Sequence, residues 1–477
     1  MRKIIFLAFF ISPVITLAQI DFGSPSATSR GGSVTAVSTD WEAIEINPSN
    51  LGWKSNPKFT MGLANIGINV QDNGVNVPLF KQIIQNADSL GTKTLGKGEI
   101  DNLYSALTAP GGLNISTTIT WAALSFSIPK IGGFAFNLSD EIYVHAYLNQ
   151  DAANVFFKGI NSSIYSDTNA AHELIANVFQ GTSVGGYDYR ELNMDYGRKI
   201  LTIRTHGSGD GGAYFESSEY LNDKLKTYDT AVAKPIEIYF GFGLKPIWGL
   251  ADYTGLISGG QNIENGTIVY TDPGYFKHPM STIFKANGRG FGYDFGLSAT
   301  YRKWKIGVSV IDLGKIEWQN NQFSASTLYF PSLDSAESQG VSKSETKIFN
   351  SFVNYNQTGG NPNFSTQLPS KFRSGISYQV TNGIQLSSDY VAPLNSVEGN
   401  ILNPYFAVGA HIHFFGVFNF GVGFATEKGF GNLVPVGVYL NIGYFEIYAA
   451  TNDFLYFVDP NSTHVFSVAT GIRLFGF

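Results

Sequence analysis

The stretch from Gly290 to Arg302, GFGYDFGLSATYR, alternates apolar or aromatic residues with glycine, small or polar ones. Side chains on a strand point alternately to the two faces of a sheet, so this stretch predicts a strand with one apolar and one polar face. Similar runs of about 10 residues, the length of a tilted strand that crosses a bilayer, recur from Ile236 to Phe477. The sequence therefore predicts an all-β fold, a transmembrane antiparallel β-barrel.

Very short turns join the expected strands in pairs. Asn382-Gly383 stands between two alternating runs, which is the strongest short signal for a hairpin. Similar turns are expected at 129–130, 197–198, 245–246, 302–303, 415–416 and 444–445. With a first strand at 58–70 and a last one at 464–477, they predict 16 strands, and the weak pair at 187–206 leaves 14 open. The first and the last strand then both place their chain ends on the periplasmic side, and the long connections, 207–235 among them, are extracellular.

Two of the long connections carry apolar residues at helical spacing. They are residues 76–107 and residues 152–179. We expect helical extracellular loops there, which either shield the barrel or form a functional lid at its outer mouth.

The composition agrees with a membrane barrel. The chain holds 53 Gly, 38 Phe and 25 Tyr, and only 14% of its residues are charged, against about 25% in an ordinary soluble domain. An apolar outer band with aromatic girdles explains both features. The net charge of −6 argues against nucleic acid as a partner.

The N-terminus predicts export. Met1-Arg2-Lys3 is a positive segment, an apolar core follows, and Thr16-Leu17-Ala18 is a small-residue cleavage site. We expect residues 1–18 to be a cleaved signal peptide and the mature protein to lie in the outer membrane of a Gram-negative bacterium. The chain contains no cysteine, which excludes a lipoprotein anchor, disulfides and thiolate chemistry.

The segment from Ser29 to Leu51, SRGGSVTAVSTDWEAIEINPSNL, resembles the opening signature of the FadL-type outer-membrane barrels, the long-chain fatty acid transporter family. In that family a glycine-rich segment and an Asn-Pro-Ala-x-Leu motif form a plug, or hatch, inside the barrel; Ser49 stands here in place of the alanine. Residues 239–250 and 290–318 are similar to a branch of the same superfamily in Bacteroidota. Members usually have 14 strands.

The resemblance implies a domain organisation: a plug over 19–55 and a barrel over 56–477. Gly31 and Gly32 would let the plug backbone pass close to the wall. Pro48 holds Asn47 extended, and the Asn47 side chain can bond to nearby backbone. The plug residues singled out, which anchor or gate the segment, are Arg30, Gly31, Gly32, Asp40, Asn47 and Pro48. The charged side chains of Arg30 and Asp40 are expected to pair with lumen residues.

Three residues on expected strands should face the lumen: His411, His413 and Asn441. Two histidines at positions i and i+2 of one strand could bind a metal, but no third ligand accompanies them, so polar lumen filling is preferred. No motif supplies residues in catalytic roles, so we expect neither an enzyme nor a cofactor.

Two functions of different kinds remain. The FadL resemblance implies passive passage of a hydrophobic, fatty-acid-like molecule across the outer membrane. The alternative is a non-transporting barrel that serves as scaffold or shuttle in an envelope secretion or barrel-assembly complex. The expected partners are membrane lipid, a hydrophobic ligand in the first case and envelope-complex proteins in the second. An apolar pocket would favour transport, whereas a packed lumen and an exposed aromatic loop patch would favour a scaffold.

Overall fold

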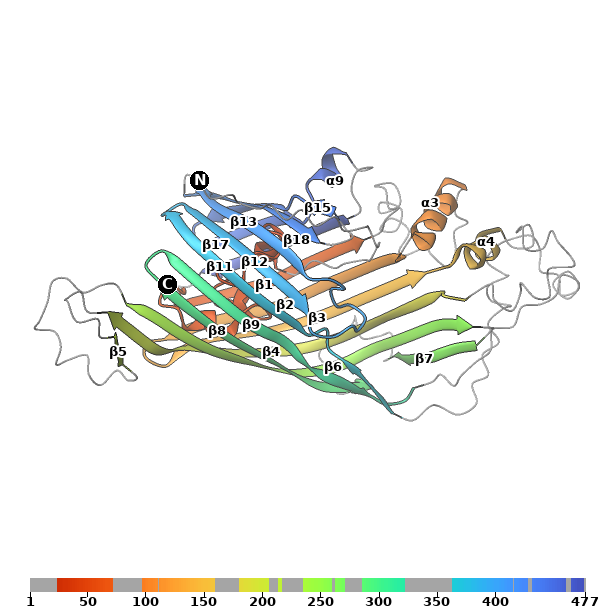
Figure 1. The fold of residues 1–477 in the computed structure, drawn as a ribbon, viewed down its shortest axis with the longest axis horizontal. Coiled ribbons are helices and arrows are strands. Elements are labelled where there is room, and N and C mark those ends of the chain that lie inside the picture. The colour runs from red at the N-terminus through yellow and green to blue at the C-terminus, as the bar shows by residue number, and fades with distance from the viewer. Residues whose placement is uncertain are drawn as a thin grey trace, which may run out of the picture.

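The computed structural model describes residues 24–71, 97–109, 111–158, 180–205, 213–216, 235–259, 262–270, 285–321, 363–414, 416–427, 431–459 and 465–475. Within them, 14 antiparallel strands pair in chain order, and the last pairs with the first, so the sheet closes into a barrel (Figure 1). The wall strands are β1 (Phe59–Gln71), β2 (Leu113–Ile128), β3 (Gly132–Tyr147), β4 (Ser183–Thr205), β6 (Ile236–Gly259), β8 (Gly288–Tyr301), β9 (Trp304–Trp318), β11 (Lys371–Thr381), β12 (Ile384–Pro393), β13 (Tyr405–Phe414), β14 (Phe418–Glu427), β16 (Val436–Ile442), β17 (Phe445–Thr451) and β18 (Val465–Phe475).

Four short strands lengthen the wall locally. They are β5 (Ala213–Glu216), which pairs with β4, β7 (Asn262–Tyr270), which pairs with β6, β10 (Phe364–Gln367), which pairs with β9, and β15 (Gly431–Leu433), which pairs with β14. Closure matters in a membrane because lipid offers no hydrogen-bond partner to an open strand edge.

The prediction of 16 strands is wrong, because two of the expected tight turns lie inside long strands. Gly197 and Arg198 continue β4, and Lys245 and Pro246 continue β6; the two strands pair from Ser183↔Leu256 to Ile203↔Ile236. Gly197 does not have a positive φ, and its backbone continues the strand instead of forming a turn. The alternative count of 14 strands is confirmed.

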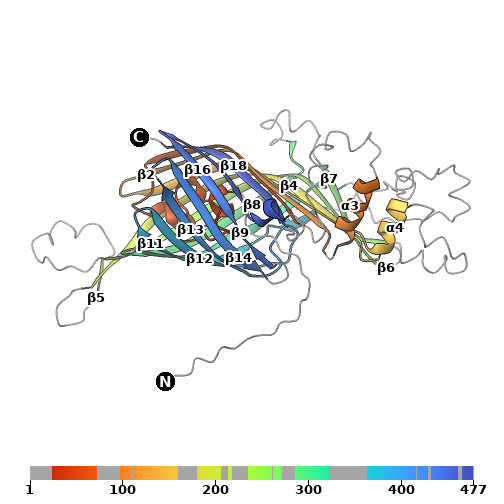
Figure 2. The same cartoon turned by 90° about the horizontal axis from the view of Figure 1, so that it is seen from above.

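The two ends of the barrel differ. Short turns join β2 to β3, β8 to β9, β11 to β12, β13 to β14 and β16 to β17 at one end, which we call the turn end; the opposite end is the loop end. β4 finishes and β6 begins at the turn end, so the connection from 206 to 235 starts and returns there. It was expected at the extracellular end, and that expectation is wrong. β5 projects beyond the turn end (Figure 2).

Helices lie at the loop end. α3 (Lys97–Thr108) and α4 (Gln150–Lys158) stand beyond the strands there (Figure 1), which confirms helical loops for these residues. The other parts of the two expected helical segments, 76–96 and 159–179, lie outside the described residues. No helix in the described ranges is long and apolar enough to cross a membrane.

The two faces of the wall carry different residues. On β8, Phe291, Phe295 and Leu297 are 45–54% exposed on the outside, whereas Asp294 and Ser298 are buried on the inside. The same parity holds on β13, β14 and β16, where Phe406, Val422 and Val438 point outward. The alternation that predicted the strands therefore also assigned their faces. A closed barrel with an apolar outer band is the architecture of outer-membrane proteins.

An arginine scan of β16 tests these faces. Val438→Arg places a charge in the lipid band and should cost about 2–4 kcal/mol of unfolding free energy if it lies near the midplane. Asn441→Arg, on the inner face of the same strand, should cost far less. Unfolding by denaturant from lipid vesicles measures both variants. Equal losses at the two positions would contradict the assignment.

Candidate functional site in the barrel lumen

The described N-terminal segment, residues 24–56, occupies the lumen, and we call it the plug. It contains three short helices, α1 (Pro25–Thr28), η1 (Asp40–Ala43) and η2 (Pro48–Gly52), and lies within the circle of strands (Figure 2). Its side chains are almost all buried; Ala36 and Asn47 are 0% exposed. Residues 1–23, which include the expected signal peptide, lie outside the described residues.

Asn47 and Pro48 form the turn that starts η2. Asn47 is the N-cap, and its Oδ1 accepts a hydrogen bond from Ser49 N at 3.2 Å and from Ser49 Oγ at 2.7 Å. Its Nδ2 lies 3.4 Å from the carbonyl oxygen of Leu297 in the wall. Ser298 of the wall receives the Trp53 indole N–H at 2.9 Å. Asn47 thus shapes the turn and brings it against β8.

Glycines of the wall leave the space for this turn. A Cβ on any of four glycines would overlap plug atoms, mostly backbone, between Asn47 and Leu51. The strand pairing aligns these glycines side by side across four adjacent strands. Side chains there would hold the plug away from the wall. This row, the glycine belt, consists of Gly133, Gly197, Gly241 and Gly296.

A second set of inward glycines receives the start of the plug. A Cβ on Gly409 would lie 2.8 Å from Arg30 Cβ, and one on Gly437 would overlap Ser29 Cβ. Gly31 and Gly32 of the plug have φ of +60° and +83°, which favours glycine, and side chains on them would meet Ala425 and Tyr405 of the wall. Backbone and wall therefore approach closely from both sides.

A buried ion pair of the wall binds the plug backbone between residues 32 and 35. Arg373 on β11 donates to the carbonyl oxygen of Gly32 at 3.0 Å and to Thr35 Oγ1 at 3.1 Å. Asp389 on β12 accepts the N–H groups of Val34 at 3.0 Å and Thr35 at 2.7 Å. Arg373 and Asp389 lie 3.8 Å apart. Together they supply hydrogen-bond partners for buried backbone groups of the plug, which has no strand of its own.

Lys245 on β6 binds the middle of the plug. Its ammonium group is fully buried and lies 3.2 Å from Glu45 of the plug and 3.1 Å from Asp294 of the wall, and it also contacts Asp312. Glu45 has φ of +60°, a left-handed backbone conformation that is uncommon for a residue other than glycine. Removing one partner of such a buried network leaves charges without compensation.

Arg473 on β18 binds the third part of the plug. It lies 3.9 Å from Asp40, contacts Glu42, and lies 3.3 Å from Glu446 on β17. Three carboxyl groups thus share one guanidinium. Burial raises the pKa of Asp40 to about 7; the charge of Glu42 also raises it, and the nearby guanidinium of Arg473 offsets part of the rise.

Arg30 does not pair with a carboxylate of the wall in the described residues. Its Nε donates to the carbonyl oxygen of Ser26 at 3.1 Å, and its Nη2 contacts Ser26 Oγ, so it braces α1 within the plug. Its stem lies over Gly409. Of the two charged plug residues expected to pair with the lumen, Asp40 lies 3.9 Å from Arg473 of the wall, whereas the described contacts of Arg30 are within the plug.

The structure separates the three lumen candidates. The ring of His411 packs edge-on against Tyr439 at 5.6 Å, and Tyr439 in turn lies 2.6 Å from Ser29 of the plug. His413 is exposed near the turn end and contacts Asn419. Asn441 pairs in register with Glu446. The three residues thus contact different neighbours.

Three other carboxylates do come together. Those of Glu45, Glu141 and Glu191 lie within 4.8 Å of one another, close enough to share a cation. Lys245 already places a positive charge 3.2 Å from Glu45. Glu45 of this group therefore already has a cationic partner.

A cavity of about 110 Å³ lies between the plug and the wall, lined by Glu45, Glu141, Tyr187, Asp312 and Lys371 among others. Ligand pockets usually measure roughly 300–1,000 Å³. This cavity is therefore smaller than an ordinary ligand pocket.

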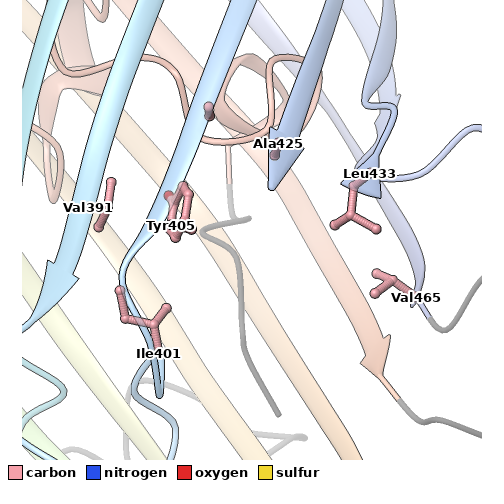
Figure 3. Packing of buried hydrophobic residues seen from close by; sticks show 7 residues of the cluster. Val391, Ile401, Tyr405, Ala425, Leu433 and Val465 are labelled. Atoms are coloured by element: carbon pink, nitrogen blue, oxygen red, sulfur yellow. The ribbon is translucent and has the colours of Figure 1, made fainter. Parts of the chain in front are cut away.

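Toward the loop end the inner face carries two buried apolar clusters, beside buried polar side chains such as Asn69, Asn114 and Asp453. One buried cluster joins Val391, Ile401, Tyr405, Leu433 and Val465, together with Ala407 and Ala425 (Figure 3). Another lies across the barrel and contains Tyr189, Ile247, Val269, Ile316, Trp318 and Leu368. A barrel lumen is usually polar, so this apolar lining is a local feature of the outer mouth.

Sequence reasoning missed the wall's share of the site. The plug was read from its own motif, but the residues that hold it are Arg373, Lys245, Arg473 and the glycine belt. A signal was present: buried charges and glycines stand at inward parity, as Asp294 and Gly296 do on β8. The parity does not say which plug residue each one meets.

Comparison with known proteins adds the following. A family of unknown function, DUF5723, matches residues 251–452. No curated protein matches the chain.

Among solved structures, the chain is similar to the toluene transporter TbuX of Ralstonia pickettii, with 13% identity, 95% of this chain and 98% of that chain covered, and a TM-score of 0.38. It is similar to the toluene transporter TodX of P. putida, with 9% identity, 95% and 97% covered, and a TM-score of 0.38. It is also similar to the monoaromatic hydrocarbon channel CymD, with 10% identity, 95% and 97% covered, and a TM-score of 0.39. The barrel architecture itself rests on the strand pairings.

A substitution in the glycine belt tests the close approach. In Gly296→Ala the new Cβ overlaps Asn47 Oδ1 and lies 3.1 Å from Pro48 Cδ. Overpacking costs about 1–3 kcal/mol, so undocking of the plug should become about tenfold more frequent. Ala36 is 0% exposed, so a cysteine at this position reacts with a thiol reagent only when the plug undocks. Because the chain has no other cysteine, the labelling rate of Ala36→Cys measures undocking.

Gly288→Ala is the matched control, because it lies on the same face of β8 and its Cβ would meet Trp318 and Gly249 of the wall rather than the plug. It should leave the labelling rate unchanged. Equal acceleration by both alanines would contradict the role of the belt.

The charge cluster around Arg473 predicts a pH dependence. The docked plug holds a proton at Asp40 up to about pH 7, against an ordinary value of 3.8. A raised pKa stabilises docking fully below the ordinary value, and this contribution is lost as the pH rises through about 7. Labelling at Ala36→Cys should therefore accelerate across that range. Asp40→Asn should flatten the response; an unchanged pH profile in this variant would assign the titration to another group.

Proposed function

We propose that this protein is a gated outer-membrane barrel through which a small hydrophobic molecule passes, and that the plug is its gate. The observation that carries the proposal is the way the plug is held. Side chains such as Arg373 and Lys245 bind it, while the hydrogen bonds of the wall close without it. The plug can therefore move without opening the barrel wall.

The apolar clusters at the loop end support a hydrophobic solute. Tyr405 and Val391 belong to one cluster and Trp318 and Ile247 to the other, and both give the outer mouth apolar patches suited to contact with a hydrocarbon. The resemblance of residues 29–51 to the FadL-type hatch also supports a hydrophobic solute. The solute would enter at the loop end and leave past the shifted plug or through a gap in the wall.

The proposal places the protein in the outer membrane of a Gram-negative bacterium, exported by a signal peptide cleaved after residue 18. Residues 19–55 then act as the gate and residues 56–477 as the barrel. Asn47 and Pro48 hold the gate shut at the glycine belt, and Glu42 fastens it to Arg473 beside Asp40. The groups around the plug bind and orient backbone, and no catalytic role is proposed for them.

Replacing Asn47 with alanine tests the gate. The variant loses the cap of η2 and the contact to Leu297 O, which should cost the docked plug about 1 kcal/mol. Uptake of a radiolabelled fatty acid by cells should rise several-fold, while heat-modifiable migration of the barrel on a gel stays normal. Labelling at Ala36→Cys provides an independent readout of the plug.

Asn441→Ala serves as control, since Asn441 lies on the inner face but pairs with Glu446 rather than with the plug. It should leave uptake as in the wild type. Faster labelling in Asn47→Ala without any change in uptake would refute a gate for this solute.

A second function has its own support. Residues 454–458, which include α9 (Leu455–Val458) at the loop end, expose Phe454, Phe457 and Val458 at 45%, 55% and 65%. An exposed aromatic patch of this kind marks contact sites between proteins, and the described lumen is packed. A barrel that serves as scaffold in an envelope complex would show no uptake in any variant and would lose co-purifying proteins when Phe457 is changed to serine.

A further inference from the structure

The connection between β12 and β13, residues 394–403, reaches into the lumen from the loop end. Gly399, near its middle, is buried and lines the lumenal cavity of about 110 Å³. Ser24, Ala27 and Glu45 of the plug line the same cavity. The cavity therefore lies between the plug, the wall and this connection, which we call the mouth strap. No function discussed above uses the strap.

The tip of the mouth strap contacts a distant part of the wall. Four wall strands, β6, β8, β9 and β11, separate β4 from β12 in the sheet. A Cβ on Gly185 of β4 would nevertheless overlap the carboxylate of Glu398, and a Cβ on Gly399 would overlap the hydroxyl oxygen of Tyr187 on β4. Since Gly399 also lines the lumenal cavity, these contacts run through the lumen. The strap thus crosses the barrel interior near its outer mouth.

The tip packs against a row of stacked tyrosines. The ring of Tyr187 lies 5.6 Å from that of Tyr143 and 5.2 Å from that of Tyr189, measured between ring centroids. The hydroxyl of Tyr143 in turn donates to Asn114 Oδ1 at 2.7 Å. Gly399 has φ of +77°, a conformation that favours glycine. A side chain at this position would therefore displace either the strap or the tyrosines.

Two asparagines fasten the base of the strap to the wall. Asn395 Nδ2 donates to the carbonyl oxygen of Leu368 at 2.7 Å, and Asn400 Nδ2 donates to that of Ser370 at 3.0 Å. Asn400 also donates to Asn395 Oδ1 at 2.8 Å and accepts the N–H of Ile401 at 2.8 Å. Ile401 is 1% exposed and belongs to the apolar cluster in Figure 3. These bonds hold the strap to the segment just before β11.

The strap can move without opening the wall. β12 ends at Pro393 and β13 begins at Tyr405, and the two strands pair from Ile384↔Ile412 to Val391↔Tyr405 without any strap residue. The residues that fasten the strap, Asn395 and Asn400, differ from those that bind the plug, such as Lys245 and Arg473. Strap and plug are thus attached to the barrel by separate sets of contacts.

We propose that the mouth strap closes the lumenal cavity toward the loop end and opens separately from the plug. The cavity is then a chamber between two barriers in series. For a passing solute the inference rests on the gated barrel proposed above: the solute would cross the strap first and the plug second. The closure of the chamber itself does not depend on transport.

Thiol labelling of the purified full-length barrel in detergent, with a small methanethiosulfonate reagent, tests the strap. Ser116 on β2 lines the cavity and is 5% exposed, so Ser116→Cys reports access to the chamber, as Ala36→Cys reports the plug. Gly399→Ala should accelerate labelling of Ser116→Cys about tenfold, because its Cβ overlaps Tyr187 and its backbone is strained. It should change labelling of Ala36→Cys less than twofold.

Gly181→Ala is the matched control. Gly181 precedes β4 at the same barrel end and has φ of +82°, but a Cβ there would meet nothing within 4 Å. The variant carries a similar backbone strain without touching the strap and should leave both labelling rates within twofold. If Gly399→Ala fails to give a heat-modifiable barrel, Asn400→Ala replaces it. That variant removes the bonds at the base and should accelerate labelling of Ser116→Cys several-fold.

Three results would overturn the proposal. Neither strap variant accelerates labelling of Ser116→Cys; Gly181→Ala accelerates it as much as Gly399→Ala does; or the strap variants accelerate labelling of Ser116→Cys and Ala36→Cys equally, which would make strap and plug one unit.

Uptake of a radiolabelled fatty acid separates this inference from the proposed function. If labelling responds as expected while uptake stays unchanged in Asn47→Ala and in Gly399→Ala, the strap is supported and passage of this solute is refuted. If uptake rises in Asn47→Ala while labelling of Ser116→Cys ignores both strap variants, the gate is supported and the strap is refuted.

Discussion

The organisation of this protein depends on the close approach of two backbones, that of the plug and that of the barrel wall. A barrel of this size would otherwise fill its lumen with wall side chains or water. Here Gly133, Gly197, Gly241 and Gly296 align across neighbouring strands and leave room for the turn at Asn47-Pro48. The plug therefore packs where the inner face of the wall lacks side chains, and the positions of the glycines determine where it lies.

Buried charged side chains of the wall then bind the plug, for which the glycines leave room. Arg373, Lys245 and Arg473 stand on three different strands and bind successive parts of the plug. Carboxylates compensate the charge of each of these cations. Removing a single partner would leave a buried charge without compensation and would destabilise the docked plug. Because these contacts are polar and side-chain-mediated, the plug is attached to the barrel without being part of its sheet.

The sequence predicted the barrel better than it predicted the site. The alternation in residues 290–302 assigned both the strand and its faces, because lipid and lumen impose opposite demands on neighbouring residues. The turns expected at 197–198 and 245–246 were wrong, since Gly197 serves to make space and Pro246 is accommodated within β6. The plug was recognisable from residues 29–51, but its partners were not: Arg373 lies 341 positions from Gly32, and one sequence does not reveal which distant residues meet.

A disulfide between plug and wall tests the central claim most directly, that residues 24–56 are docked in the lumen. The hydroxyl oxygens of Ser33 and Ser387 on β12 lie 2.9 Å apart, so cysteines at these two positions should form a disulfide in intact outer membranes. Cysteines at Ser33 and at Ser125 on β2, which does not contact Ser33, provide the control and should stay reduced. Mass spectrometry of the digested protein should find the Ser33–Ser387 cross-link in most molecules. Its absence, or equal cross-linking of both pairs, would contradict a docked plug.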